Sequence, residues 1–169
     1  MRAMILAAGL GTRMQPLSAL RPKPILPVRG IPLLAYPLAW LAHHGVDEVI
    51  VNLHHFPDAT RAVAEVWAPP GLRVHFSDEP VLLDTGGGIR RAANFLRESD
   101  PSLVIAGDMI LDLDLQPLLA RHRERGDDSW LRHAPATLGY LRRALSRVAA
   151  LDARLARLGD LVGDGACAR

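Results

Sequence analysis

The spacing of apolar and polar residues along the chain predicts strands in some stretches and helices in others. A continuous apolar run at residues 4–8 is typical of a strand that is buried on both faces of a parallel sheet. Leu34, Leu38 and Leu41 recur at three- and four-residue steps, which predicts a helix that ends at Gly45. By the same reasoning we expect further strands at 48–53, 73–76 and 102–106, and further helices at 58–67, 85–96 and 115–125.

Strand and helix alternate along the chain, and this order predicts an α/β fold: a Rossmann-like, doubly wound and mostly parallel sheet. We expect this domain to occupy residues 1–128. Ligands of such sheets bind at the carboxyl ends of the strands, so residues that follow a strand are candidates for a site. Gly9, Asn52, Glu79 and Asp108 each follow one of the predicted strands.

Residues 129–169 form an atypical tail that differs in composition from the rest of the chain. Leucine, alanine and arginine make up 24 of these 41 residues. Leucines recur at helical spacing from 138 to 158, which predicts an amphipathic helix that Gly159 ends. The abrupt change suggests a reading-frame change or a truncation in a GC-rich gene. Resequencing that found one intact long frame coding for this tail would contradict that hypothesis.

Charge and composition argue against several classes of protein. The net charge of +2 comes from the tail, because residues 1–128 carry 13 basic and 15 acidic side chains. A nucleic-acid-binding surface on the main domain is therefore not indicated. No apolar run reaches the roughly eighteen residues of a membrane span, so we expect no membrane partner. A single cysteine, Cys167, excludes an internal disulfide and fits the cytoplasm, while the oligomeric state stays open.

The strongest candidate for chemistry is the glycine turn that follows the first predicted strand. Gly9 and Gly11 leave backbone N–H groups open to an anion, and Thr12 and Arg13 follow directly. Lys23 stands between two prolines that restrict its backbone, and it is the single lysine beside nineteen arginines. Together these residues predict a cradle for a polyphosphate. The alternative is an ordinary tight turn with a surface arginine and a surface lysine.

A second candidate segment, residues 77–89, contains three consecutive glycines. A flat base could lie against the exposed backbone of Gly86 and Gly87, and Glu79 would accept a hydrogen bond from a base N–H. The alternative is a flexible loop in which Thr85 caps the following helix. Asn52, at the end of its strand, either faces the same site or serves a structural turn.

The third candidate is Asp108, which follows a buried strand and a glycine. Such a carboxylate suits a hard cation, although an aspartate after a strand also commonly caps a turn. Asp112 and Asp114 are expected to cap the helix that begins near residue 115.

Other polar and aromatic residues receive no functional role. The adjacent histidine pairs at 43–44 and 54–55 lack zinc-ligand spacing and are expected to be solvated. Trp40, Trp67 and Phe95 fit helix packing better than base stacking.

The stretch LAAGLGTRMQPLSALRPKPILPV resembles the signature of the sugar-1-phosphate nucleotidyltransferase family, which has the form G-x-G-T-R, a short spacer and P-K-P. The resemblance covers about residues 1–126, and the L-x-T-G-G-G segment is similar to the family's base-recognition segment. The glycine turn at residues 9–13 is not a Walker A sequence, because no G-K-[ST] follows it. Met14 stands where a dinucleotide fingerprint would have its third glycine.

The resemblance implies transfer of a nucleotidyl group from an NTP to a sugar 1-phosphate, with pyrophosphate released, as in nucleotide-sugar synthesis for cell-envelope polysaccharide. Attack on the α-phosphorus would be direct, helped by Arg13, Lys23 and a Mg²⁺ ion that Asp108 ligates. Arg13, Lys23 and Asp108 are thus the expected catalytic residues. The expected nucleotide-binding residues are Leu6, Ala7, Ala8, Gly9, Gly11, Thr12, Arg13, Lys23, Asn52, Glu79, Thr85, Gly86 and Gly87.

The T-G-G-G segment is compatible with GTP and mannose 1-phosphate and also with UTP and N-acetylmuramate 1-phosphate. Family members continue beyond the matching region with a sugar-phosphate site and a second metal-binding aspartate. Asp160 and Asp164 match no motif of the family and receive no role. Two alternatives therefore remain: a truncated nucleotide-binding module without turnover, and a non-functional fragment.

Overall fold

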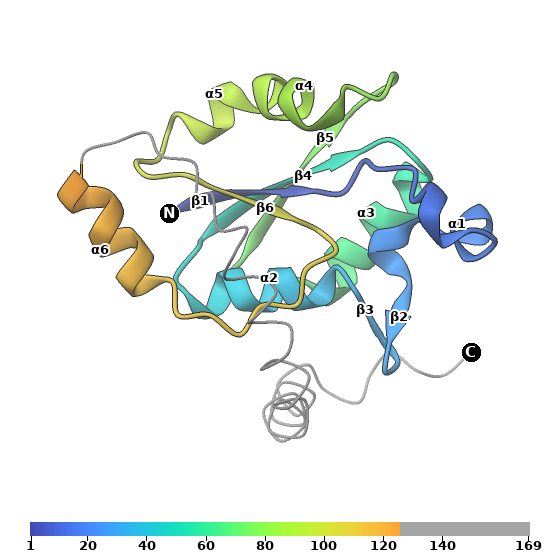
Figure 1. Cartoon of the computed structure of the whole chain (residues 1–169), viewed down its shortest axis with the longest axis horizontal. Helices are drawn as coiled ribbons and strands as arrows, with labels where there is room; N and C mark the ends of the chain where they lie inside the picture. Colours follow the sequence, from blue (N-terminus) through green and yellow to red (C-terminus); the bar gives the residue numbers. More distant parts are fainter. Residues whose placement is uncertain (126–169) are drawn as a thin grey trace. The chain divides into compact units, whose positions relative to one another are not determined.

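The computed structural model describes residues 1–125, which fall into two units that are described separately: Met1–Leu113, and residues 114–125 of the second unit. The first unit contains a four-stranded parallel sheet in the order β5-β4-β1-β6 (Figure 1). Its strands are β1 (Arg2–Leu6), β4 (Glu48–Leu53), β5 (Arg73–Asp78) and β6 (Leu103–Ala106). The predicted α/β fold with a parallel sheet is confirmed.

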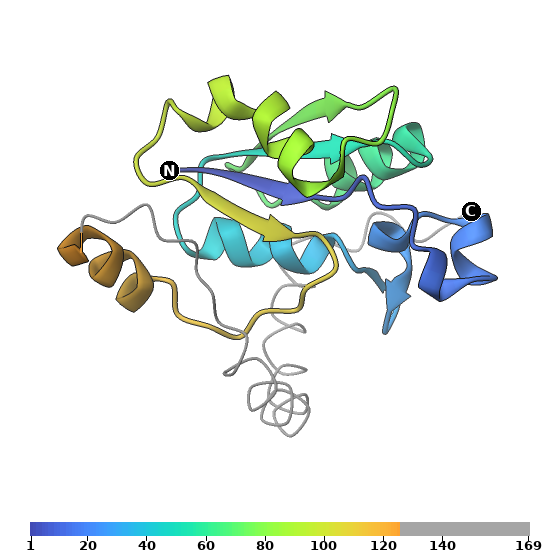
Figure 2. The same ribbon diagram turned by 45° about the horizontal axis from the view of Figure 1, so that its top comes forward.

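Alternate residues of β1 pack into two separate hydrophobic cores, one on each face of the sheet. Ala3 and Ile5 belong to the core that includes α2 (Ala35–His43) and α3 (Pro57–Trp67). Met4 belongs to the core that includes residues of α4 (Asp84–Arg91) and α5 (Ala93–Leu96). The two helix pairs accordingly cover opposite faces of the sheet (Figures 1 and 2). Each fully buried large apolar side chain contributes about 1.5–3 kcal/mol to the free energy of unfolding.

Most predicted elements lie within a few residues of the observed ones. The helix α2 is followed by Gly45, whose φ of 77° is the left-handed geometry expected after a helix end. The helix predicted at 85–96 is instead two helices, because it is interrupted at Ala92 between α4 and α5. No helix in residues 1–125 has the length and apolar character needed to cross a membrane.

The second unit is described through α6 (Gln116–Arg125), as expected from the helical pattern there. The backbone N–H of Gln116, the first residue of α6, donates to Asp114 Oδ1 at 2.9 Å. Asp114 therefore satisfies an N–H of the first turn, as predicted, but from two residues before the helix and not from the N-cap position. The predicted domain boundary at 128 and the tail helix at 138–158 lie outside the described residues.

Between β1 and α2 the chain forms several short elements that the apolar pattern did not predict. They are the 3-10 helices η1 (Thr12–Met14) and η2 (Lys23–Ile25), the helix α1 (Leu17–Leu20), and the antiparallel pair β2 (Pro27–Val28) and β3 (Ile31–Pro32). Arg29 and Gly30 both have positive φ and make the expected turn, which here joins β2 to β3.

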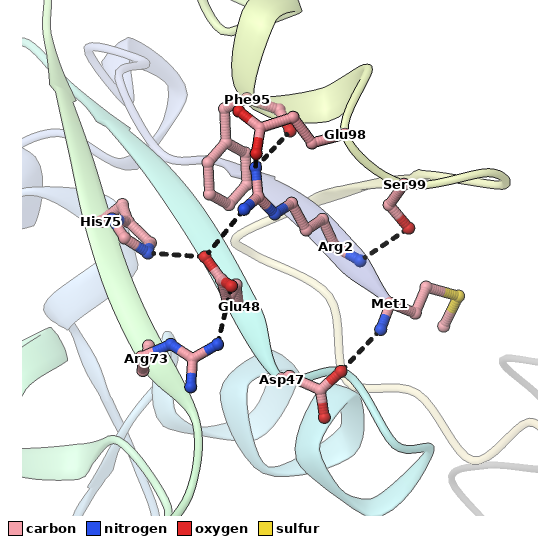
Figure 3. Close-up of polar contacts among 9 residues, drawn as sticks. All are labelled: Met1, Arg2, Asp47, Glu48, Arg73, His75, Phe95, Glu98 and Ser99. Atoms are coloured by element: carbon pink, nitrogen blue, oxygen red, sulfur yellow. Dashed lines mark hydrogen bonds and ion pairs between the residues drawn. The ribbon is translucent and has the colours of Figure 1, made fainter.

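Charged residues join the strands of the parallel sheet near their amino ends (Figure 3). Glu48, the first residue of β4, accepts hydrogen bonds from Arg73 at 2.7 Å and from His75 at 3.1 Å, both on β5. Arg2 on β1 lies 3.4 Å from the same carboxylate. The amino group of Met1 bonds Asp47 Oδ2 at 2.7 Å. Opposite charges therefore cover the amino ends of three neighbouring strands.

Candidate functional site

The glycine turn after β1 lies against the side chain of Lys23. Gly11 has a φ of 63°, a left-handed conformation that favours glycine. A Cβ at this position would lie 3.2 Å from the Cβ of Lys23 and 3.3 Å from the Cβ of Ser18. The backbone conformation and the close approach both favour glycine at this position, where the turn lies beside Lys23 and Ser18.

Lys23 and Asp108 meet at the carboxyl edge of the sheet. Lys23 opens η2 directly after Pro22, and its Nζ donates to Asp108 Oδ2. Asp108 follows β6, whose end is held to β1 because the N–H of Gly107 donates to the carbonyl of Leu6 at 2.9 Å. The two side chains are 33% and 36% exposed, so each can also be reached by a ligand.

A second group of polar contacts links the ends of β1, β4 and β5, and we call it the Asn52–Glu79 relay. Asn52 Oδ1 accepts a hydrogen bond from the N–H of Ala7 at 2.7 Å. Asn52 Nδ2 donates to Glu79 Oε1 at 2.8 Å, and Glu79 Oε2 accepts from the N–H of Leu83 at 3.1 Å. Asn52 and Glu79 are each only 3% exposed. The relay consists of these four residues: Ala7, Asn52, Glu79 and Leu83.

The three consecutive glycines lie inside the first turns of α4 and not in a loop. Thr85 is within this helix and does not cap it, because the residue at the N-cap position is Leu83. The flexible-loop alternative is therefore wrong. Gly88 packs directly on the relay, since a Cβ there would lie 2.9 Å from both Asn52 Nδ2 and Glu79 Oε1. A Cβ on Gly86 would meet no atom within 4 Å, so its backbone is open on that side.

The remaining candidates from the sequence lie in two settings. Ala7 and Ala8 are buried, and Leu6 is partly buried at the end of β1. The outer part of the turn is open: Gly9, Thr12 and Arg13 are exposed, and a Cβ on Gly9 would meet nothing within 4 Å. The structure thus collects the turn, Lys23 and Asp108 at the ends of β1 and β6. It links Asn52 and Glu79 to the same turn through Ala7.

Sequence reasoning missed the role of the histidines beside the site. His54 and His55 are partly buried instead of fully solvated. His54 Nδ1 lies 2.7 Å from the carbonyl oxygen of Glu79, and since a carbonyl only accepts, the ring nitrogen donates. His55 Nε2 bonds the carbonyl of Ser18 at 3.3 Å. The two histidines directly follow β4, and this position after a strand was the sequence signal that could have placed them beside the site.

Ser18 is a further residue that the sequence did not single out. Its side chain is 2% exposed, and its Oγ has no hydrogen-bond partner within the described part of the chain. Over residues 1–125, no three histidine, cysteine, aspartate or glutamate side chains are grouped closely enough to hold a metal ion by themselves.

Comparison with known sequences identifies related proteins for most of the chain. The family model described as "Nucleotidyl transferase" matches residues 2–135. Mannose-1-phosphate guanylyltransferase of Mycobacterium tuberculosis is 36% identical over 126 residues, which cover 75% of this chain and 35% of that protein. N-acetylmuramate alpha-1-phosphate uridylyltransferase of Neisseria meningitidis is 38% identical over 115 residues, which cover 68% of this chain and 49% of the relative. The chain thus spans between about a third and a half of the length of these relatives.

A solved structure shares the arrangement of the described elements. HddC from Yersinia pseudotuberculosis, in complex with GMP-PN, superimposes with a TM-score of 0.63 and 33% sequence identity. The match covers 72% of this chain and 53% of HddC.

Proposed function

Because this chain belongs to the nucleotidyl transferase family, we propose that it transfers a nucleotidyl group from a nucleoside triphosphate to a sugar 1-phosphate and releases pyrophosphate. The observation that carries this proposal is the contact between Lys23 and Asp108 beside the glycine turn. A cation, a carboxylate and exposed backbone N–H groups at one edge of a parallel sheet suit a polyphosphate.

The proposed chemistry is positioning together with neutralisation of charge. The open backbone at Gly9 and the N–H groups of Gly11 and Thr12 would contact phosphate oxygens. Arg13 and Lys23 would neutralise the negative charge that grows on the α-phosphate and the departing pyrophosphate. The sugar phosphate oxygen attacks the α-phosphorus in line, and no covalent bond to the protein forms.

Asp108 suits a role as a ligand of Mg²⁺, which we propose as the cofactor. Magnesium is usually held by one or two carboxylates and completed by substrate phosphates and water. A single partly exposed carboxylate beside the phosphate-binding turn matches that donor set. When bound, the cation would lower the charge of the triphosphate and fix its geometry.

For the substrates we propose either GTP with mannose 1-phosphate or UTP with N-acetylmuramate 1-phosphate. One relative is named as a mannose-1-phosphate guanylyltransferase and another as an N-acetylmuramate alpha-1-phosphate uridylyltransferase, and these two names support the choice. The base would lie against the start of α4, where Thr85 and Gly86 are exposed and Gly87 is partly buried. The reaction would take place in the cytoplasm and supply nucleotide sugars for cell-envelope polysaccharide.

A second candidate function is a nucleotide-binding module without turnover. It would need only a nucleotide site within the described residues, and the chain as given spans 35% and 49% of the two relatives. Calorimetry with GTP, UTP and dTTP, beside a pyrophosphate-release assay with both sugar phosphates, separates the two. Binding with release supports the transferase, and binding without release supports the module. A chain that binds none of the three nucleotides contradicts both.

A further inference from the structure

We infer that Asn52 and Glu79 are positioning residues: they set the glycine turn and the start of α4 relative to each other and do not themselves touch the nucleotide. This inference rests on the proposed function, since it deepens the description of the same nucleotide site. It replaces the direct contact between Glu79 and a base that the sequence alone predicted.

The relay provides a continuous path between the two segments. Ala7 lies two residues before Gly9, and its N–H donates to Asn52. Leu83 directly precedes α4, and its N–H donates to Glu79. Between them, the bond from Asn52 to Glu79 joins β4 to the residue that follows β5. A shift of either side chain would therefore move the phosphate-binding turn and the base-binding segment relative to each other.

The direction of every hydrogen bond in the relay is fixed by its two ends. The N–H of Ala7 can only donate, so the oxygen of the Asn52 amide faces it and the NH₂ group faces Glu79. The N–H of Leu83 can also only donate, so Glu79 must accept on both sides, which a carboxylate does.

The surroundings of the relay leave both side chains closed to a ligand. Each is 3% exposed, and the backbone of Gly88 lies against the bond between them. The carbonyl of Glu79 is bonded by His54. Each carboxylate oxygen already accepts from one protein donor, and at 3% exposure the side chain would have to move before a base N–H could reach it.

This polarity gives a test by exchange of partners. In Asn52→Asp, two carboxylates face each other. In Glu79→Gln, an NH₂ group must face either the amide of Asn52 or the N–H of Leu83. In the double variant the hydrogen bond between positions 52 and 79 is reversed. The carboxylate introduced at position 52 accepts from the N–H of Ala7 and from the amide NH₂ introduced at position 79. The oxygen of that amide accepts from the N–H of Leu83. The double variant thus matches every donor with an acceptor and keeps the net charge.

Two measurements are made on the full 169-residue chain for the wild type, both single variants and the double variant. One is the exchange of the Ala7 and Leu83 amide hydrogens without nucleotide, followed by NMR. The other is the affinity for GTP and UTP, measured by calorimetry. Asn94→Asp on α5 and Glu65→Gln on α3 make the same chemical changes at exposed positions and serve as controls.

Each single variant should speed exchange at Ala7 or Leu83 and weaken nucleotide affinity about tenfold, the effect of one lost buried hydrogen bond. The double variant should restore both. Faster exchange with unchanged affinity would mean that the relay only stabilises the fold, and would overturn the inference. If Glu79→Gln lost nucleotide affinity and the double variant did not restore it, direct contact between Glu79 and the base would be indicated. That result would also overturn the inference.

Outcomes outside this pattern also decide the question. If a single variant fails to fold, the double variant must still fold and bind, and its failure contradicts the inference. A wild type that binds no nucleotide contradicts the proposed function, whereas amide exchange still reports the relay. Unchanged exchange in both single variants would show that the relay does not join the two segments.

Discussion

The ammonium group of Lys23 forms an ion pair with the carboxylate of Asp108, which lies 85 residues further along the chain. Both side chains are about a third exposed, so solvent screens the pair. Exposed ion pairs contribute about 0–1 kcal/mol to the free energy of unfolding. The pair is therefore a minor source of stability, and its interest lies in the charges that it presents beside the glycine turn.

Replacing Lys23 by alanine should lower turnover much more than nucleotide affinity. Loss of one charge that stabilises a transition state typically costs about 10²–10³-fold in kcat. Pyrophosphate release at saturating NTP and saturating sugar 1-phosphate gives kcat, and calorimetry gives the affinity for the NTP. Lys23→Arg is the matched control: it keeps the charge but replaces a compact ammonium by a planar fork, so an intermediate rate is expected. Unchanged turnover in Lys23→Ala would refute the role of the ammonium.

Gly9 and Gly11 should respond differently to substitution by alanine. Gly11→Ala places a Cβ 3.2 Å from that of Lys23 at a φ of 63°, and should lower the free energy of unfolding by about 1–2 kcal/mol. Gly9→Ala meets no protein atom and should change it by less than about 0.5 kcal/mol.

The affinity of Gly9→Ala for GTP or UTP should nevertheless fall about tenfold, because the methyl group would occupy the open side of the turn. Urea unfolding and calorimetry measure the two quantities. Full affinity in a stable Gly9→Ala chain would place the phosphates elsewhere.

Two glycines of α4 make a second pair with opposite expected effects. Gly88→Ala would bring a Cβ to 2.9 Å from the side chains of both Asn52 and Glu79, and should destabilise the fold by about 1–3 kcal/mol. Gly86→Ala has free space and a helical backbone, and should stabilise the fold by about 0.5 kcal/mol. Thermal unfolding without nucleotide measures both. Equal effects of the two substitutions would contradict the close packing of Gly88 on the relay.

The pattern of apolar residues predicted the strands well because the sheet is parallel and buried. The runs at β1, β4 and β6 are nearly continuous, as burial on both faces requires. The short pair β2 and β3 was missed because proline occupies one position in each strand, and proline suppresses the usual strand signal.

The candidate site was predicted only where residue type alone indicates chemistry. Lys23 stands out as a single lysine between prolines, and Asp108 as an acid after a strand. The relay depends on which way the Asn52 amide turns and on how closely Gly88 approaches it. These are tertiary relationships, so the sequence could identify Asn52 and Glu79 as candidates but could not distinguish a ligand-binding residue from one that orders the backbone.

The acidic limb of the stability curve should depend on Glu48, the centre of the ion pairs at the amino ends of the strands (Figure 3). The hydrogen bond from Arg73, aided by the charge of Arg2, lowers the pKa of the Glu48 carboxyl from its usual value of about 4.5. A carboxyl whose pKa is lower in the folded state stabilises the fold at pH values above the usual pKa, and this contribution is lost as the pH falls through the lowered value.

Glu48→Gln should therefore have a lower Tm than the wild type at pH 7, and the two Tm values should converge as the pH drops below about 4.5. Glu65→Gln, at an exposed position on α3, should follow the wild type over the whole range. If the Tm difference between Glu48→Gln and the wild type were the same at pH 3 and pH 7, the stabilisation would come from packing of the side chain and not from its charge.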